Sequence, residues 1–218
     1  MYEFATGDET LSINVVVEKA SSDTLRTRGL SSLGYSDLIA RLPHPQFEAS
    51  LRELLRLYGE YQLQSKVVIK ADEKLVFGYW IVMTKIRDDA LLELWESTSD
   101  GNGFLPGVEL TLRYWVDQHA TCTRAQAAFT PPNPAQMVAI SEGVIEGDYP
   151  LSGVRYDAPP HMSGWYLTTE RYNGDIETMR VEHMYHVTAV RPELARYIAL
   201  PPGYRFNMWE HRDEISLD

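Results

Sequence analysis

The stretch Thr130-Pro131-Pro132-Asn133-Pro134 divides the sequence into two parts. Three prolines in four positions lack backbone donors and clash with a regular chain, so neither a helix nor a central strand can continue through them. The 218 residues are enough for two small units, each with its own hydrophobic core. We therefore predict an N-terminal domain over residues 1–130 and a C-terminal domain over residues 136–218.

The N-terminal part combines strand and helix patterns. A helix is predicted that follows Pro43 and Pro45 and stops at Gly59, because its apolar residues fall on one stripe: Phe47, Leu51, Leu54, Leu55 and Tyr58. Alternation and β-branched residues predict strands over 11–17, 65–70, 74–83 and 108–116, with a hairpin turn at Ala71-Asp72-Glu73. Residues 21–36 are predicted as loop, and residues 88–98 as a short helix whose first-turn acids suit the helix dipole.

The C-terminal part is predicted to contain mostly strands. These cover 137–145, 151–156, 164–169 and 204–209, with turns at Gly147-Asp148 and at 172–175. Residues 179–187 fit a strand followed by a short helix, and 191–200 fit a helix that Pro201-Pro202-Gly203 ends. The predicted fold class is α+β, with two small parts that each pack a mostly antiparallel sheet against one or two helices.

The charge of the chain limits its partners. There are 31 acidic and 20 basic residues, for a formal net charge of -11. Such a chain is repelled by nucleic acid and by anionic lipid and is attracted to a basic partner. The same acidity also serves simply to keep a protein soluble.

One acidic row and one aromatic residue are candidate binding residues. On the predicted helix 88–98, Asp89, Glu93 and Glu96 lie on one side, which is either a solvated face or a docking strip for lysine and arginine. Trp209 and Glu210 join them, since exposed tryptophan is typical of interface anchors. These five residues form the predicted partner-binding set.

The search for chemistry finds no enzyme motif. The sequence has no nucleophile elbow and no phosphate-binding glycine loop, and its single cysteine, Cys122, matches no catalytic pattern. His183 and His186 would share a helix face, but zinc needs further ligands that no second cluster offers. We expect a protein without catalytic activity, metal or cofactor.

The working location is the cytoplasm. A single cysteine allows no intrachain disulfide and fits a reducing compartment. The segment MYEFATGDET does not fit a secretory signal, and no apolar run approaches the roughly 20 residues that span a bilayer. No membrane partner is therefore expected.

The order of motifs in the last third resembles a known domain. The sequence runs Ser141-Glu142-Gly143-Val144-Ile145-Glu146-Gly147, Val154-Arg155-Tyr156, Ser163-Gly164-Trp165-Tyr166-Leu167, Arg191-Pro192-Glu193-Leu194 and Leu200-Pro201-Pro202-Gly203-Tyr204-Arg205-Phe206. Over residues 136–210 this order is similar to the bacterial immunity-protein domain Imm33. Met162 stands where the family usually has an acidic residue, and the loop after the Ser-Gly-Trp step is shortened.

The resemblance implies an immunity protein that binds and blocks a cognate antibacterial toxin, of the kind delivered by type VI or contact-dependent secretion. Nucleases carry basic clefts, so the acidity adds the expectation of a basic effector, occluded sterically at the residues Asp89, Glu93, Glu96, Trp209 and Glu210. The alternative that stays open is a non-catalytic adaptor or ligand-binding module.

Overall fold

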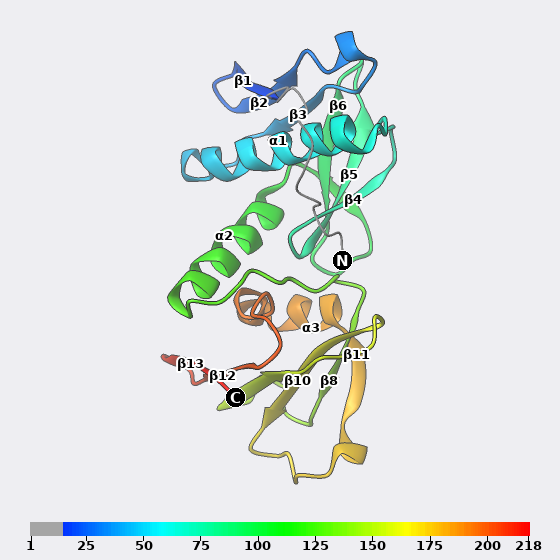
Figure 1. The fold of residues 1–218 in the computed structure, drawn as a ribbon. Helices are drawn as coiled ribbons and strands as arrows, with labels where there is room; N and C mark the ends of the chain where they lie inside the picture. Colours follow the sequence, from blue (N-terminus) through cyan, green and yellow to red (C-terminus); the bar gives the residue numbers. More distant parts are fainter. Residues whose placement is uncertain (1–14) are drawn as a thin grey trace.

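The computed structural model describes residues 15–218, and within them the chain forms two sheets with helices between them (Figure 1). The helix α2 (Glu109–Arg124) crosses the space between the sheets. Both sheets mix parallel and antiparallel pairs, mostly antiparallel, and both carry helices, so the predicted α+β class is confirmed. No helix of the described residues is long and apolar enough to cross a bilayer.

The N-terminal sheet has the order β1-β2-β3-β6-β5-β4, and β7 pairs with β6 beyond this path. Its strands are β1 (Val16–Ser21), β2 (Thr24–Arg28), β3 (Leu38–Arg41), β4 (Lys74–Phe77), β5 (Trp80–Ile86), β6 (Leu92–Ser97) and β7 (Phe104–Pro106). The short 3-10 helices η1 (Ser31–Leu33) and η2 (Pro45–Phe47) and the helix α1 (Glu48–Ser65) complete this part.

Helix α1 packs on one face of this sheet through the predicted apolar stripe, including Leu51, Leu54 and Leu55. The helix continues past Gly59, where we predicted its end. The glycine instead permits a close contact within the fold, since a side chain there would lie 2.6 Å from Val15. In the following turn, the buried Gln62 accepts hydrogen bonds from Ser36 and Ile69 backbone N–H groups.

The C-terminal sheet has the order β11-β8-β10-β9-β12-β13. Its strands are β8 (Met137–Ile140), β9 (Leu151–Arg155), β10 (Met162–Thr169), β11 (Arg180–His183), β12 (Tyr204–Met208) and β13 (Asp213–Leu217). The 3-10 helix η3 (Ile176–Thr178) lies in a connection, and α3 (Met184–Val190) and the 3-10 helix η4 (Pro192–Arg196) cover the face of the sheet toward α2 (Figure 1).

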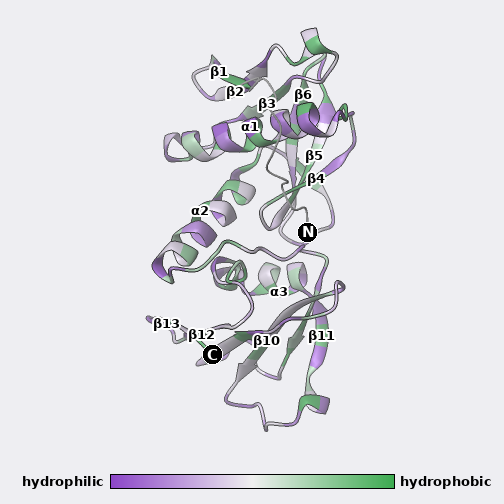
Figure 2. Ribbon diagram, in the orientation of Figure 1, coloured by the Kyte–Doolittle hydropathy of each residue, from purple (hydrophilic) through white to green (hydrophobic). Residues whose placement is uncertain are grey.

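The described residues bury two hydrophobic cores, and α2 contributes to both. Leu112 belongs to the core under the N-terminal sheet, whereas Tyr114 and Cys122 belong to the core of the C-terminal sheet. The N-terminal residues Tyr79 and Trp80 also lie in that second core. Figure 2 accordingly shows hydrophobic and hydrophilic residues alternating along α2, as a helix packed on two sides requires.

Two predicted elements of the N-terminal part have the opposite type, and two others are displaced. The strand predicted over 108–116 is the start of α2, and the helix predicted over 88–98 is the strand β6. Residues 65–70 form no strand, so the hairpin is β4–β5, which turns at Gly78 rather than at residues 71–73. The predicted loop 21–36 contains β2. The predicted strand 11–17 begins before residue 15 and so lies partly outside the described residues. The N-terminal segment that was predicted not to be a secretory signal lies outside them as well.

The C-terminal predictions are closer to the structure. Strands are confirmed at β8, β9, β10 and β12, although β8 ends at Ile140 and residues 142–145, predicted as its continuation, form a turn. Residues 180–190 form a strand followed by a short helix. The predicted helix 191–200 is only the 3-10 helix η4, and β13 was not predicted. Residues 125–136, which include the proline-rich stretch, contain no helix or strand. The division at residues 130 and 136 stays a prediction.

Candidate functional site

The topology of the C-terminal sheet brings loops of the described chain together at one of its ends. The parallel strands β8 and β10 both finish there, and the antiparallel neighbours β9 and β11 begin there. The β12–β13 hairpin also turns at this end, since Met208 pairs with Leu151 and with Asp213. The loops at this end are residues 141–150, 170–179 and 209–212.

These loops are strongly acidic. Together they carry seven carboxylates against two arginines, Arg171 and Arg212. The carboxylates belong to Glu142, Glu146, Asp148, Glu170, Asp175, Glu177 and Glu210, and most of these residues are exposed. We call this surface, residues 141–150, 170–179 and 209–212, the acidic end.

The first loop of the acidic end has a backbone that its own residues hold in place. Gly143 has φ +90°, and a side chain there would lie 2.5 Å from Thr169 Oγ1 and 2.7 Å from Asp148 Oδ2, so glycine is required. Thr169 Oγ1 donates to the Glu142 carbonyl, and the Thr169 N–H donates to Ser141 Oγ. The turn is therefore attached directly to the end of β10.

A buried arginine fixes the other side of this loop. Arg191, which is 4 % exposed, donates through Nη1 to the Val144 carbonyl at 2.8 Å and through Nε to Glu193. Its guanidinium also lies 4.9 Å from the ring of Tyr149. The loop is thus fixed both to β10 and to the segment that follows α3, which makes it a preformed surface.

Charges within the acidic end are organised around Arg171. Its guanidinium bridges Glu142 at 2.9 Å and Asp148 at 2.7 Å, joining the first loop to the second. The hydrogen bond to Glu142 raises the pKa of Arg171 above its usual range. Hydrogen bonds from its own backbone N–H and from Gly143 lower the pKa of Glu146. The carboxylate of this exposed residue therefore remains ionised under mildly acidic conditions.

The structure separates the members of the predicted acidic row. Asp89 lies exposed in the turn before β6, and Glu93 lies on the face of the N-terminal sheet away from α1. Glu96 points to the opposite face and is buried, with Leu110 and Thr111 N–H groups bound to its carboxylate. A common helical side for these acids is wrong, because the segment is a strand whose neighbours alternate between faces.

Trp209 and Glu210 lie in the β12–β13 turn, at the acidic end. The Arg212 guanidinium stacks over Trp209 at 4.3 Å from the ring, and Glu210 is exposed. That these two residues bind a partner stays a prediction. The other acids of this end were not singled out from sequence, because three separate loops supply them. The available signal was the recurrence of acids beside turn glycines, as in Glu142-Gly143 and Gly174-Asp175.

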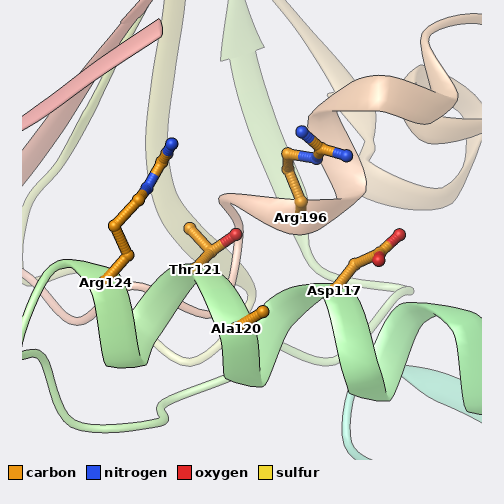
Figure 3. A pocket seen from close by; sticks show the side chains of 5 residues that line it. All are labelled: Asp117, Ala120, Thr121, Arg124 and Arg196. Carbon is orange, nitrogen blue, oxygen red and sulfur yellow. The ribbon is translucent and has the colours of Figure 1, made fainter.

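Two shallow hollows lie on the surface of residues 15–218. One, of about 190 Å³, lies between α2 and η4 and is lined by Arg196 on η4 and by Asp117, Ala120, Thr121 and Arg124 on α2 (Figure 3). Arg124 borders it and pairs with Asp213, which also accepts from the Tyr197 hydroxyl. The other, of about 490 Å³, lies at the end of the C-terminal sheet opposite the acidic end, and His161 and His183 line it. No group of three metal-binding side chains is found among residues 15–218.

This combination defines the class of the C-terminal part: a mixed-sheet domain that presents a fixed acidic loop surface. Residues 117–217 match the family model of the Imm33-like domain. This region of similarity to the Imm33-like domain begins in the second half of α2 and extends through β13. The match extends further at both ends than residues 136–210, and it contains the whole acidic end. Comparison with curated proteins and with solved structures gives no match.

Proposed function

We propose that this chain is a cytoplasmic immunity protein that binds a cognate secreted antibacterial toxin and neutralises it by steric occlusion, without catalysis. The toxin is of the kind delivered by type VI or contact-dependent secretion. The observation that carries the proposal is the acidic end, a fixed acidic surface inside the Imm33-like domain.

The chemistry of this surface fits a basic partner, such as a nuclease effector. A nuclease holds phosphates in a cleft lined by lysine and arginine, and a row of carboxylates can occupy the same cleft. Opposite charge also raises the association rate, which matters for an inhibitor that must act before the toxin does. A loop fixed at Gly143, Thr169 and Arg191 loses little conformational entropy on binding.

Co-expression with the toxin encoded beside this chain's gene tests the proposal. We expect the chain to restore growth of cells that produce the toxin and to co-purify with it. Binding should weaken as salt is added, since exposed charges are screened over about 8 Å at physiological ionic strength. If the chain neither protects the cells nor binds the toxin, the immunity function is wrong.

A charge-reversal pair tests the surface separately. Glu170→Lys with Glu177→Lys changes two exposed acids of the acidic end, and we expect it to slow toxin association by on the order of tenfold. Asp88→Lys with Asp89→Lys makes the same change of net charge at the turn before β6 and serves as the matched control. If the control pair abolished protection and the first pair did not, the binding surface would lie at the acids predicted from the sequence instead.

A further inference from the structure

The outer face of the N-terminal sheet, on the side away from α1, presents a continuous apolar surface. Met83 pairs with Trp95, and Trp95 with Pro106, so these side chains form one row across β5, β6 and β7. The next row contains Val76 opposite Ile81, then the buried Ser97 on β6, which pairs with Phe104 on β7. Within the described residues, none of these side chains packs into either hydrophobic core.

This apolar surface has the composition of an interface. Val76 is 48 % exposed, and Trp95, Met83 and Ile81 are partly exposed. Tryptophan and methionine are enriched in protein interfaces, and monomeric proteins rarely expose contiguous apolar patches of large side chains. The Lys74 ammonium lies 5.4 Å from the centroid of the Phe104 ring, and Trp95 Nε1 donates to Glu93 at 2.9 Å, so charged groups border the surface.

The register makes this surface complementary to itself. Across β5 and β6, Met83 lies opposite Trp95, and in the adjacent row Lys85 lies opposite Glu93. A twofold axis parallel to the strands and midway between β5 and β6 exchanges the two strands. It would place Met83 of one copy against Trp95 of the other, and Lys85 of one copy against Glu93 of the other.

We propose that a second copy of this chain docks on this face as an isologous dimer, in an aligned packing of the two sheets. Charge selects this occupant. Lys74 and Lys85 border the surface and disfavour the basic partner that the acidic end suits, whereas a second copy brings Glu93 to Lys85, which also pairs with Asp72 of its own copy. The dimer uses the N-terminal sheet alone and leaves the acidic end of the other sheet free.

Sedimentation velocity of the full chain, from micromolar to submillimolar concentration, tests the proposal. We expect a reversible monomer–dimer equilibrium. Val76→Glu with Met83→Glu places two charges in the apolar surface and should raise the dissociation constant by tenfold or more, about 1.4 kcal/mol. Val181→Glu is the matched control, because Val181 is a 51 % exposed valine on the edge strand of the other sheet.

A charge swap tests the twofold register and changes no apolar side chain. Lys85→Glu alone and Glu93→Lys alone should each weaken the dimer, and the double variant should restore it, because opposite charges face each other again. A wild-type chain that stays monomeric at every concentration overturns the proposal. So does a dimer that persists in Val76→Glu with Met83→Glu, one that Val181→Glu dissociates, or a double charge swap without recovery.

Discussion

The two sheets of the molecule each bury a charged side chain, but they bury charges of opposite sign. In the N-terminal sheet the side chain is Glu96, and in the C-terminal sheet it is Arg155; both residues are less than 10 % exposed. Among residues 15–218, backbone groups and one hydroxyl satisfy these charges in place of a counter-ion. Buried charges without such hydrogen bonds would be strongly unfavourable.

The two charges connect different numbers of segments. Glu96 accepts from the N–H groups of Leu110 and Thr111 and from the Thr111 hydroxyl, and so joins β6 to the start of α2. Its carboxylate therefore caps the N-terminus of α2, because Val108 at the N-cap position has an apolar side chain that cannot accept a hydrogen bond. Arg155 donates instead to carbonyl groups in β10, in the proline-rich stretch and after η4.

The comparison implies that the C-terminal domain depends more on one residue than the N-terminal part does. Burial lowers the pKa of Arg155 to about 10, so the guanidinium is still charged at neutral pH. Its planar fork carries five N–H donors, more than any other side chain, and can donate to several carbonyls at once. The Ser163, Thr130, Ile198 and Leu200 carbonyls would all lose a donor together if Arg155 were removed.

The largest expected effect is therefore that of Arg155→Met. Methionine fills part of the space but leaves the Ser163, Thr130 and Leu200 carbonyls without this donor, while the Ile198 carbonyl keeps only the Trp165 indole N–H. We expect a loss of about 3–5 kcal/mol in the free energy of unfolding. Urea denaturation followed by tryptophan fluorescence measures it. Arg205→Met is the control, since Arg205 is a partly exposed arginine that pairs with Asp218, and it should cost less than about 1 kcal/mol. Equal effects at the two positions would contradict the role given to Arg155.

Replacement of Glu96 should have a smaller effect. In Glu96→Gln an amide group faces the Thr111 N–H, so one or two hydrogen bonds are lost, and we expect a cost of about 1–3 kcal/mol. Faster amide exchange at Leu110 and Thr111 would locate the damage at the start of α2. Glu109→Gln, at a partly exposed acid in the same helical turn, should cost less than about 0.5 kcal/mol. Unchanged amide exchange in Glu96→Gln would show that Glu96 does not cap this helix.

Glu96 and α2 also show why the N-terminal part was harder to predict than the C-terminal part. Leu92, Leu94 and Glu96 alternate toward the core of the sheet, but the glutamate breaks the apolar pattern of the strand. In α2, Val108 and Leu112 pack into one core and Leu110 and Tyr114 into the other. Together with the exposed Val116 they give apolar residues at alternate positions from 108 to 116, which is typical of a strand. Each error has its cause in a contact between segments distant in the sequence.

The C-terminal strands could be predicted because turns separate them and their inward positions are apolar. Trp165 and Leu167 in β10 and Phe206 in β12 keep this alternation. The acidic end could not be assembled in the same way. Its acids come from three loops whose proximity depends on strand order and on the parallel pairing of β8 with β10, and local sequence does not specify either one.

The smallest expected effect lies between the two sheets, at His119 on α2. Its ring stacks on Phe129 at 3.9 Å and lies tilted against Trp115 at 4.2 Å between ring centroids. Burial lowers its pKa below 6.5, opposed by the carboxylate of Glu53. As pH falls below about 6.5, the unfolded chain takes up a proton before the folded chain does, so stability falls. The contribution is complete above pH 6.5 and is lost as the pH falls toward the folded pKa.

The variant His119→Phe keeps the aromatic stack and removes the titrating group. We expect the free energy of unfolding of the wild type to fall relative to this variant as pH is lowered from 7 to 5, with a parallel dependence above pH 7. His161→Gln, at an exposed position, controls for the loss of a histidine elsewhere. Parallel curves over the whole range would show that protonation of His119 is as favourable in the folded chain as in the unfolded one. The surroundings of His119 on α2 would then accommodate a charged imidazolium without the set of hydrogen bonds that Glu96 and Arg155 have in the two sheets.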